Sequence, residues 1–281
     1  MDRIREALFS TDAIRVCDPE TPFWYTSGKL GPIYINTHFL YGGEQKANEL
    51  LDEIEKAAAS DRLLFPVKIT EILWQQYQEN PIFKFITDNL VENARKVKVD
   101  FISGGERRDF FFSILPAFLL KKPHLSIFKD GEAVYTDADF KKTIHADKVE
   151  LEGKTSLHIV DLITEASSFT RSWLPVIRRF GAQMKYALTV VDRMQGGMLL
   201  LEKESVSGTA LIEIKPELFY LAEERNIIDK DQLNLILNFI EKPDEFMPKF
   251  LDSHPDFIAN QILLGGKNKE RALLAIEKGN G

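Results

Sequence analysis

The chain has 281 residues, of which 44% are hydrophobic and 28% are charged. This composition is ordinary for a globular protein and supplies enough apolar residues for one sizeable domain with an appendage, so it excludes a disordered chain. The 43 acidic residues outnumber the 36 basic ones and leave a net charge of -7. This charge argues against a dedicated nucleic-acid-binding protein, because such proteins neutralise phosphates with clustered Lys and Arg.

Neither an export signal nor a membrane span is recognisable in the sequence. The first 16 residues mix charged and apolar side chains at helical spacing, unlike the continuous apolar core of a signal peptide. The longest apolar run, residues 110–120, is interrupted by Ser113 and Pro116 and predicts a buried helix. The single cysteine, Cys17, fits a reducing compartment. The sequence therefore predicts a cytoplasmic protein with no membrane partner and no nucleic-acid partner.

Two patterns follow one another along the chain. Apolar side chains recur at helical spacing between residues 43 and 98, which predicts a run of helices. Beyond them, short apolar runs near 99–103, 125–128, 157–161 and 187–191 alternate with helical segments. Strands that alternate with helices predict parallel βαβ units and an α/β fold with a doubly wound sheet.

The last part of the chain has a different pattern of apolar residues and prolines. A strand-like run, residues 209–214, leads into Pro216, and helical patterns interrupted by further prolines follow it. We therefore predict an α/β domain over residues 1–210, helical N-terminal part included, and a C-terminal helical appendage over residues 211–281. No internal repeat is visible in the sequence.

Open sheets of this kind bind ligands beyond the carboxyl ends of their strands, so the loops after the four predicted strands are the candidate sites. After the third strand, Asp161 ends the apolar run and Thr164, Ser167 and Ser168 precede a helical pattern. Hydroxyl side chains beside the free N–H groups of a helix start can hold a phosphate. The alternative is a helix cap with no ligand, since Ser and Thr are favoured caps.

Three other turns carry basic side chains. Lys29 follows Ser27 and Gly28 in a turn that can supply both charge and backbone donors to an anion, or can be a hairpin turn with a solvated lysine. After the first strand, two glycines permit close backbone approach, and Arg107 and Arg108 follow them. Arg193 lies in the loop after the fourth strand.

Taken in chain order, from about residue 23 to residue 197, these motifs resemble those of type I phosphoribosyltransferases of the orotate phosphoribosyltransferase family. Asp161 matches the second acid of the family's phosphoribosyl-pyrophosphate (PRPP) signature, and Thr164 matches its first loop threonine. Two positions depart from the signature: Val160 replaces the first acid and Ala166 replaces a glycine. On the resemblance, changing both to the family pattern is expected to strengthen PRPP binding by about 2 to 5 kcal/mol.

The resemblance implies a role for each matched residue. Lys29 and Arg193 are expected to hold the carboxylate of orotate, and Arg107 or Arg108 to approach the pyrophosphate. Lys129 and Asp161 are expected at the catalytic centre. The 5'-phosphate is expected in the loop that contains Thr164, Glu165, Ala166, Ser167 and Ser168.

Lys129 also opens the segment that resembles the family's mobile catalytic loop. That segment, residues 129–160, is longer than in the family, and Lys141, Lys142 and His145 match its Lys and His pair only loosely.

The implied fold is a phosphoribosyltransferase-like doubly wound parallel sheet with an added helical segment, and the implied function is conversion of orotate and PRPP to orotidine 5'-phosphate and pyrophosphate. Mg2+ is expected to enter bound to PRPP, with no direct protein ligand, and the chain is expected to form a homodimer. Two alternatives to this function remain open. In one, the chain is a catalytically weak relative with a ligand-binding, regulatory or structural role. In the other, it is a transferase with another acceptor.

Overall fold

The computed structural model describes residues 2–279, which divide into two compact units. The first unit comprises residues 2–13 and 37–214, and the second comprises residues 14–36 and 215–279. The division at residue 214 lies close to the sequence-based boundary at residue 210. The N-terminal segment 14–36, however, groups with the tail rather than with the α/β domain.

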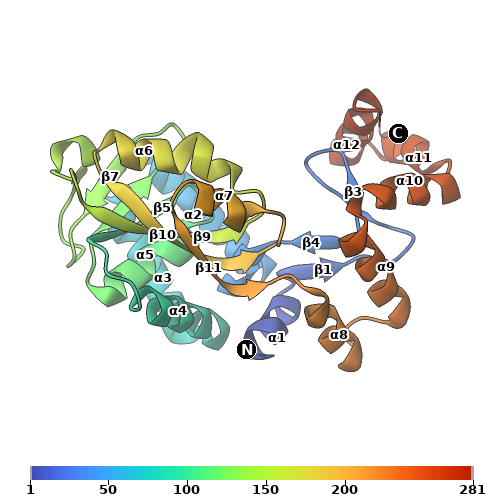
Figure 1. Cartoon of the computed structure of the whole chain (residues 1–281), viewed down its shortest axis with the longest axis horizontal. Coiled ribbons are helices and arrows are strands. Elements are labelled where there is room, and N and C mark those ends of the chain that lie inside the picture. Colours follow the sequence, from blue (N-terminus) through green and yellow to red (C-terminus); the bar gives the residue numbers. More distant parts are fainter. Residues whose placement is uncertain (1, 280–281) are drawn as a thin grey trace. The chain divides into compact units, whose positions relative to one another are not determined.

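A seven-stranded sheet forms the centre of the first unit (Figure 1), with the strand order β11-β10-β9-β5-β6-β7-β8. Five strands run parallel, and β7 and β8 add an antiparallel edge. The strands are β5 (Phe101–Gly105), β6 (His124–Ile127), β7 (Ala133–Thr136), β8 (Thr143–His145), β9 (Thr155–Ile163), β10 (Gln183–Asp192) and β11 (Ser207–Glu213). The doubly wound α/β prediction is therefore confirmed.

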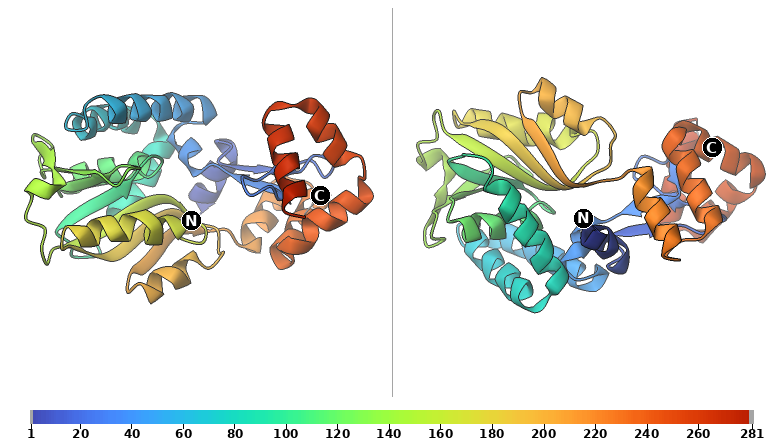
Figure 2. Two further views of the ribbon diagram at one scale, coloured as in Figure 1. Left: turned by 90° about the horizontal axis from the view of Figure 1, so that it is seen from above. Right: turned by 60° about the horizontal axis from the view of Figure 1, so that its bottom comes forward.

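Helices cover both faces of this sheet, and Figure 2 shows the sheet lying between the two layers. One layer comprises α2 (Glu44–Ser60), α3 (Phe65–Glu79), α4 (Pro81–Ala94) and α5 (Phe110–Leu120). The opposite layer comprises α6 (Leu174–Arg179) and α7 (Gly197–Lys203), and α6 is preceded by the π-helical turn η3 (Phe169–Trp173). The remaining helical segments of the unit are α1 (Asp2–Ser10), η1 (Thr37–Tyr41) and η2 (Ala146–Lys148).

The apolar run of residues 110–120 forms the helix that the sequence predicts. Its first eight side chains are buried, and α5 packs against β5, β6 and β9. Because this helix starts directly after the loop that follows β5, its burial fixes that loop against the end of β9. No helix within residues 2–279 combines the length and apolar character needed to cross a membrane.

The segment after β6 folds back as an antiparallel hairpin instead of forming one long loop. Val134 of β7 pairs with His145 of β8, and Thr136 Oγ1 lies 3.1 Å from Thr143 Oγ1. Lys141 and Lys142 are exposed in the turn between these strands. The resemblance implies a mobile catalytic loop here; the structure gives this segment as a hairpin at the sheet edge, and its mobility stays a prediction.

The second unit combines two short two-stranded antiparallel sheets with five helices. Strand β1 (Ile14–Val16) pairs with β4 (Ile33–Ile35), and β2 (Phe23–Trp24) pairs with β3 (Leu30–Gly31). The indole of Trp24 donates to Gln261 Oε1 at 3.0 Å, and the Tyr25 ring lies 6.4 Å from that of Phe239. These contacts group residues 14–36 with the tail. The helices are α8 (Pro216–Glu224), α9 (Lys230–Glu241), α10 (Pro243–Ser253), α11 (Phe257–Leu264) and α12 (Gly266–Glu277).

Candidate functional site

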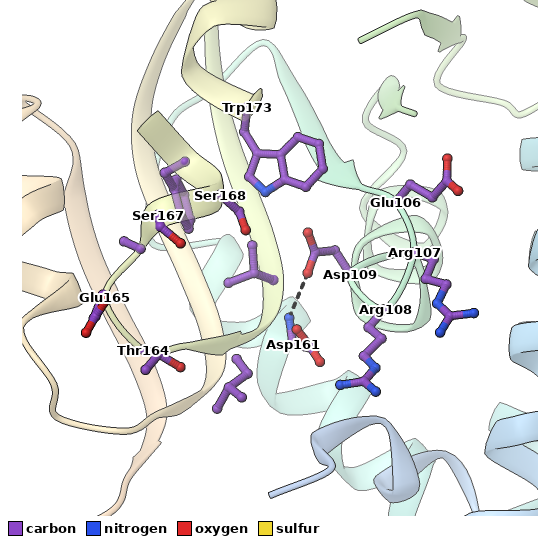
Figure 3. A pocket seen from close by; sticks show the side chains of 14 residues that line it. Glu106, Arg107, Arg108, Asp109, Asp161, Thr164, Glu165, Ser167, Ser168 and Trp173 are labelled. Carbon is purple, nitrogen blue, oxygen red and sulfur yellow. Dashed lines mark hydrogen bonds between the residues drawn. The ribbon is translucent and has the colours of Figure 1, made fainter. Parts of the chain in front are cut away.

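A polar cavity of about 340 Å³ lies at the carboxyl ends of β5 and β9 in the first unit (Figure 3). The loop after β5 forms one wall and the loop after β9 forms the other, as the general rule for open parallel sheets predicts. The lining residues are Glu106, Arg107, Arg108, Asp109, Val160, Asp161, Leu162, Thr164, Glu165, Ala166, Ser167, Ser168, Phe169 and Trp173.

The loop after β9 holds its hydroxyl side chains at the cavity in an unusual backbone conformation. Ala166 has φ 54°, in the left-handed region, which costs a residue with a Cβ about 1 to 2 kcal/mol relative to glycine. The backbone N–H of Gly197 donates to Thr164 O at 3.0 Å and ties this loop to the one after β10. Ser168 makes no capping hydrogen bond, and Glu165 is exposed. The cap alternative therefore does not account for the Ser168 hydroxyl.

Gly104 and Gly105, which end β5, have no room for a side chain. A Cβ at Gly104 would collide with the Ser113 side chain, and a Cβ at Gly105 would collide with the Trp173 ring. This close packing brings Trp173 to the cavity and leaves the following arginines at its rim. Arg107 is partly exposed and forms an ion pair with Glu55. The Arg107 charge is therefore already balanced by a carboxylate before any ligand binds.

Two carboxyl groups meet at the floor of the cavity. The backbone N–H of Asp161 donates to Asp109 Oδ1 at 3.2 Å, and that of Gly105 donates to Asp109 Oδ2 at 3.2 Å. Both aspartates are 7% exposed, and Oδ2 of Asp161 accepts no hydrogen bond from the residues that the structure describes. A buried acceptor without a protein donor is costly unless a ligand or water supplies one.

Burial and the local charges set the protonation of this pair. Burial, followed by the charge of Asp161, raises the pKa of Asp109 well above its ordinary range. Burial also raises the pKa of Asp161, but the nearby Arg108 guanidinium opposes this shift. Arg108 therefore favours the charged form of Asp161, and Asp109 is the member of the pair that holds a proton more readily.

A buried histidine lies beside the carboxyl pair. His158 Nδ1 is 2.8 Å from Ser103 Oγ, and its Nε2 is 3.9 Å from Asp109 Oδ2. The rings of Phe169 and Trp173 pack against the imidazole. Burial lowers the pKa of His158 to about 3, so the ring is neutral at physiological pH and adds no positive charge to the site.

The other predicted site residues lie outside the lining of this cavity. The N–H of Lys129 donates to Glu106 Oε2 at 2.9 Å, and Lys129 lines an adjoining cavity of about 430 Å³ together with Arg107. The N–H of Arg193 donates to Ile163 O at 2.9 Å, which holds the loop after β10 against the end of β9. Lys129 and Arg193 thus belong to the same unit as the cavity.

Lys29 belongs to the second unit, where its Nζ lies 2.7 Å from Asp244 Oδ1. Lys29 and Arg193 are therefore in different units, and their joint binding of one anion stays a prediction.

Sequence reasoning did not assign roles to Asp109, Trp173 or His158. Asp109 does carry a local sequence signal. It follows two arginines and directly precedes a helix whose side chains are almost all apolar, so it stands next to a buried segment. Trp173 and His158 carry no comparable signal, because their relevance comes from packing against loops that are distant in the sequence.

The described residues contain no group of three or more His, Cys, Asp or Glu side chains that could hold a metal ion. Of the four acidic side chains that line the cavity, Asp109 and Asp161 are the buried ones.

A scan against known protein families returns no match for the chain. Among curated proteins, it is 23% identical over 163 residues to the orotate phosphoribosyltransferase of Sulfolobus acidocaldarius, covering 57% of this chain and 77% of that protein. It is 25% identical over 118 residues to the adenine phosphoribosyltransferase of Mycoplasma mobile, covering 40% of this chain and 68% of that protein.

Solved structures agree with these relatives on the fold. Leishmania donovani UMP synthase superposes with a TM-score of 0.58 at 16% identity over 85% of this chain, which spans 42% of that longer protein. Orotate phosphoribosyltransferase from Francisella tularensis superposes with a TM-score of 0.52 at 13% identity, over 84% of this chain and 96% of that one. The chain thus has the type I phosphoribosyltransferase fold, and its sequence is similar to an orotate and an adenine phosphoribosyltransferase.

Proposed function

We propose that the protein is a phosphoribosyltransferase that binds PRPP in the cavity between the loops after β5 and β9, with orotate as the acceptor. The observation that carries this proposal is the cavity itself, where two arginines, a hydroxyl-bearing loop and a buried carboxyl pair line one space. Such a set matches a ligand with anionic ends and a hydroxyl-bearing centre. The curated relatives named for this activity support the reaction class.

The side chains act mainly by position and charge. In the transfer, the bond from ribose C1 to the pyrophosphate oxygen breaks, a bond from C1 to a ring nitrogen of the acceptor forms, and pyrophosphate leaves. Arg108 and Lys129 offset the charge of the leaving group, Thr164 and Ser168 donate to the 5'-phosphate, and Asp161 accepts from ribose hydroxyls. Mg2+ that arrives bound to PRPP would supply further charge neutralisation.

The acceptor is the finer part of the proposal. One curated relative is named for orotate and the other for adenine, so both bases are tested. The favoured acceptor is orotate, because Lys29 and Arg193 stand at the positions that the resemblance assigns to its carboxylate. An adenine acceptor has no carboxylate and needs neither charge.

The test is release of pyrophosphate by the purified protein with PRPP and Mg2+, in parallel with orotate, with adenine and without acceptor. Orotate-dependent release is expected, and it should fall at least tenfold in Asp161→Asn. Asp88→Asn provides a matched control, because Asp88 is an exposed partner of Lys84 on α4. Release that depends on adenine alone would overturn the orotate assignment, and no release with either base would overturn the transferase.

A second candidate, ligand binding with little turnover, is favoured by the loop after β9. Ala166 holds a strained backbone, and the Val160 side chain is packed in the apolar core where the resemblance expects an acid. This candidate predicts that PRPP binds by calorimetry while pyrophosphate release stays at background.

The homodimer and the cytoplasmic location are also proposals. The homodimer rests on the resemblance, which implies that a loop of one subunit reaches the site of the other. The cytoplasmic location rests on the single cysteine and on the lack of a recognisable export signal. A dimer mass by light scattering is expected at about micromolar concentrations. A monomer under the same conditions would contradict shared sites.

A further inference from the structure

The carboxyl pair at the cavity floor offers more acceptor capacity than the protein uses. A carboxylate has about four lone-pair positions. Asp109 accepts two backbone N–H groups, both at 3.2 Å, and Oδ2 of Asp161 accepts nothing from the described residues. Both residues are 7% exposed and line the cavity. The side chains of Asp109 and Asp161 also hydrogen-bond each other, and a ligand group that donates hydrogen bonds would fill the acceptor positions that remain.

The walls of the cavity limit what that group can be. Arg108 and the hydroxyls of Thr164 and Ser168 surround the floor and suit an anionic group such as a phosphate. The floor is acidic and repels a phosphate, so the part of the ligand that contacts it must be uncharged and must donate. Adjacent hydroxyl groups on a phosphorylated sugar meet both conditions.

Only Asp161 of this pair lies in the segment that resembles a PRPP signature, and the neighbouring Val160 cannot provide a second acid. Its side chain is 2% exposed and belongs to the apolar cluster under α6, with Leu174 and Ile177. Asp109, 52 positions earlier in the chain, reaches the same floor from the loop after β5. The fold thus places a second carboxyl group beside Asp161 from a different strand.

We propose that Asp109 and Asp161 together bind the vicinal hydroxyl groups of a ribose 5-phosphate moiety, with Asp109 serving as a specificity-determining residue for ribose over 2-deoxyribose. This inference rests on the proposed function, since it names the group within that cavity that recognises the sugar. Burial and the charge of Asp161, which raise the pKa of Asp109, fit the pair, because a carboxyl group that keeps its proton can donate to one hydroxyl while Asp161 accepts from the other.

The test measures binding of three probes by calorimetry: ribose 5-phosphate, 2-deoxyribose 5-phosphate and inorganic phosphate. The unaltered protein should bind ribose 5-phosphate about tenfold more tightly than the 2-deoxy compound. Asp109→Ala should weaken ribose 5-phosphate about tenfold or more, abolish the preference and leave inorganic phosphate unchanged. Asp88→Asn, on α4 away from the cavity, should behave as the unaltered protein.

A purely structural role for Asp109 gives a different result, because a displaced loop would weaken all three probes alike. Asp109→Asn covers the risk that the alanine variant fails to fold, since its amide oxygen can still accept from the Asp161 N–H. Its amide group can also donate to a hydroxyl as a protonated carboxyl group does, so the Asn variant should keep the preference for ribose. A folded alanine variant that keeps the full preference, or a folded Asn variant that loses it, would overturn the inference while the proposed function stands. An unaltered protein that binds none of the probes would overturn both.

Discussion

Two regions of the molecule carry the basic and hydroxyl side chains that mark anion sites, and they differ in how those groups are satisfied. At the cavity of the first unit, Asp161 keeps a buried oxygen without a donor among the described residues. At the turn of the second unit, Lys29 pairs with Asp244, and Arg271 donates to Thr26 O at 2.6 Å. Residue type alone does not distinguish a ligand site from a set of intramolecular ion pairs and hydrogen bonds. A buried polar group that lacks a hydrogen-bond partner does distinguish them.

The largest effect is expected from forcing a charge into the cavity floor with Val160→Asp. The free energy of unfolding should fall by about 3 kcal/mol, because the new carboxylate would be buried in an apolar cluster beside two other acids. The resemblance predicts improved PRPP binding for Val160→Asp combined with Ala166→Gly, and the burial of Val160 predicts that the first of these changes lowers stability. Denaturant unfolding measures the loss, and Val160→Thr, which replaces one methyl group by a hydroxyl, should lose about 1 kcal/mol.

Equal stability of Val160→Asp and the unaltered protein would show that the floor accepts a third acid. The cavity would then be more hydrated than the burial of its side chains indicates. It would differ less from the solvated turn that contains Lys29 in the second unit.

The next effect concerns the arginine that borders the carboxyl pair. Arg108→Ala should weaken binding of inorganic phosphate about tenfold to a hundredfold, since a hydrogen bond to a charged group contributes about 1.5 to 3 kcal/mol. Arg178→Ala is the control, because Arg178 pairs with Glu204 at the surface of the same unit. Calorimetry that finds both variants unchanged would remove the cavity as the phosphate site.

A smaller effect is expected at Ala166. Replacement by Gly relieves about 1 to 2 kcal/mol of left-handed strain but removes a buried methyl group worth about 0.8 kcal/mol, for a net gain of about 0.5 kcal/mol. Ala57→Gly, in the middle of α2, should instead lose about 1 kcal/mol. Thermal unfolding compares the two, and a loss in both would mean that the loop does not hold this conformation in solution.

The smallest effect is expected in the second region. Lys29→Ala should leave thermal stability unchanged, because the Lys29–Asp244 pair is exposed and water screens it. The informative readout is the KM for orotate, which should rise if Lys29 binds the acceptor. Asp244→Ala is the matched control, since it breaks the same ion pair and leaves the lysine in place. An unchanged KM in Lys29→Ala would confine the turn to a structural role.

The sequence was sufficient for the centre of the fold and for the walls of the site. Four short apolar runs predicted β5, β6, β9 and β10, because buried parallel strands are apolar throughout. The loops after β5 and β9 followed from the rule that ligands bind at strand ends. The β7–β8 hairpin was missed, since its strands of four and three residues lie in a polar segment without a clear alternation.

The rest depended on contacts between residues far apart in the chain. Asp109 and Asp161 meet across 52 positions, and Trp24 and Gln261 across 237. Neither contact leaves a local pattern, because the partners are too far apart in the chain for their spacing to indicate that they meet. The floor of the cavity and the grouping of residues 14–36 with the tail therefore emerged only from the folded arrangement.

Amide hydrogen exchange with and without ribose 5-phosphate tests the central claim most directly, since it reports on both regions in one experiment and does not require turnover. Ligand should slow exchange in residues 105–109 and 164–168, the two loops of the cavity, and leave residues 26–29 of the second unit unchanged. Protection confined to residues 26–29, with none in either cavity loop, would contradict the account.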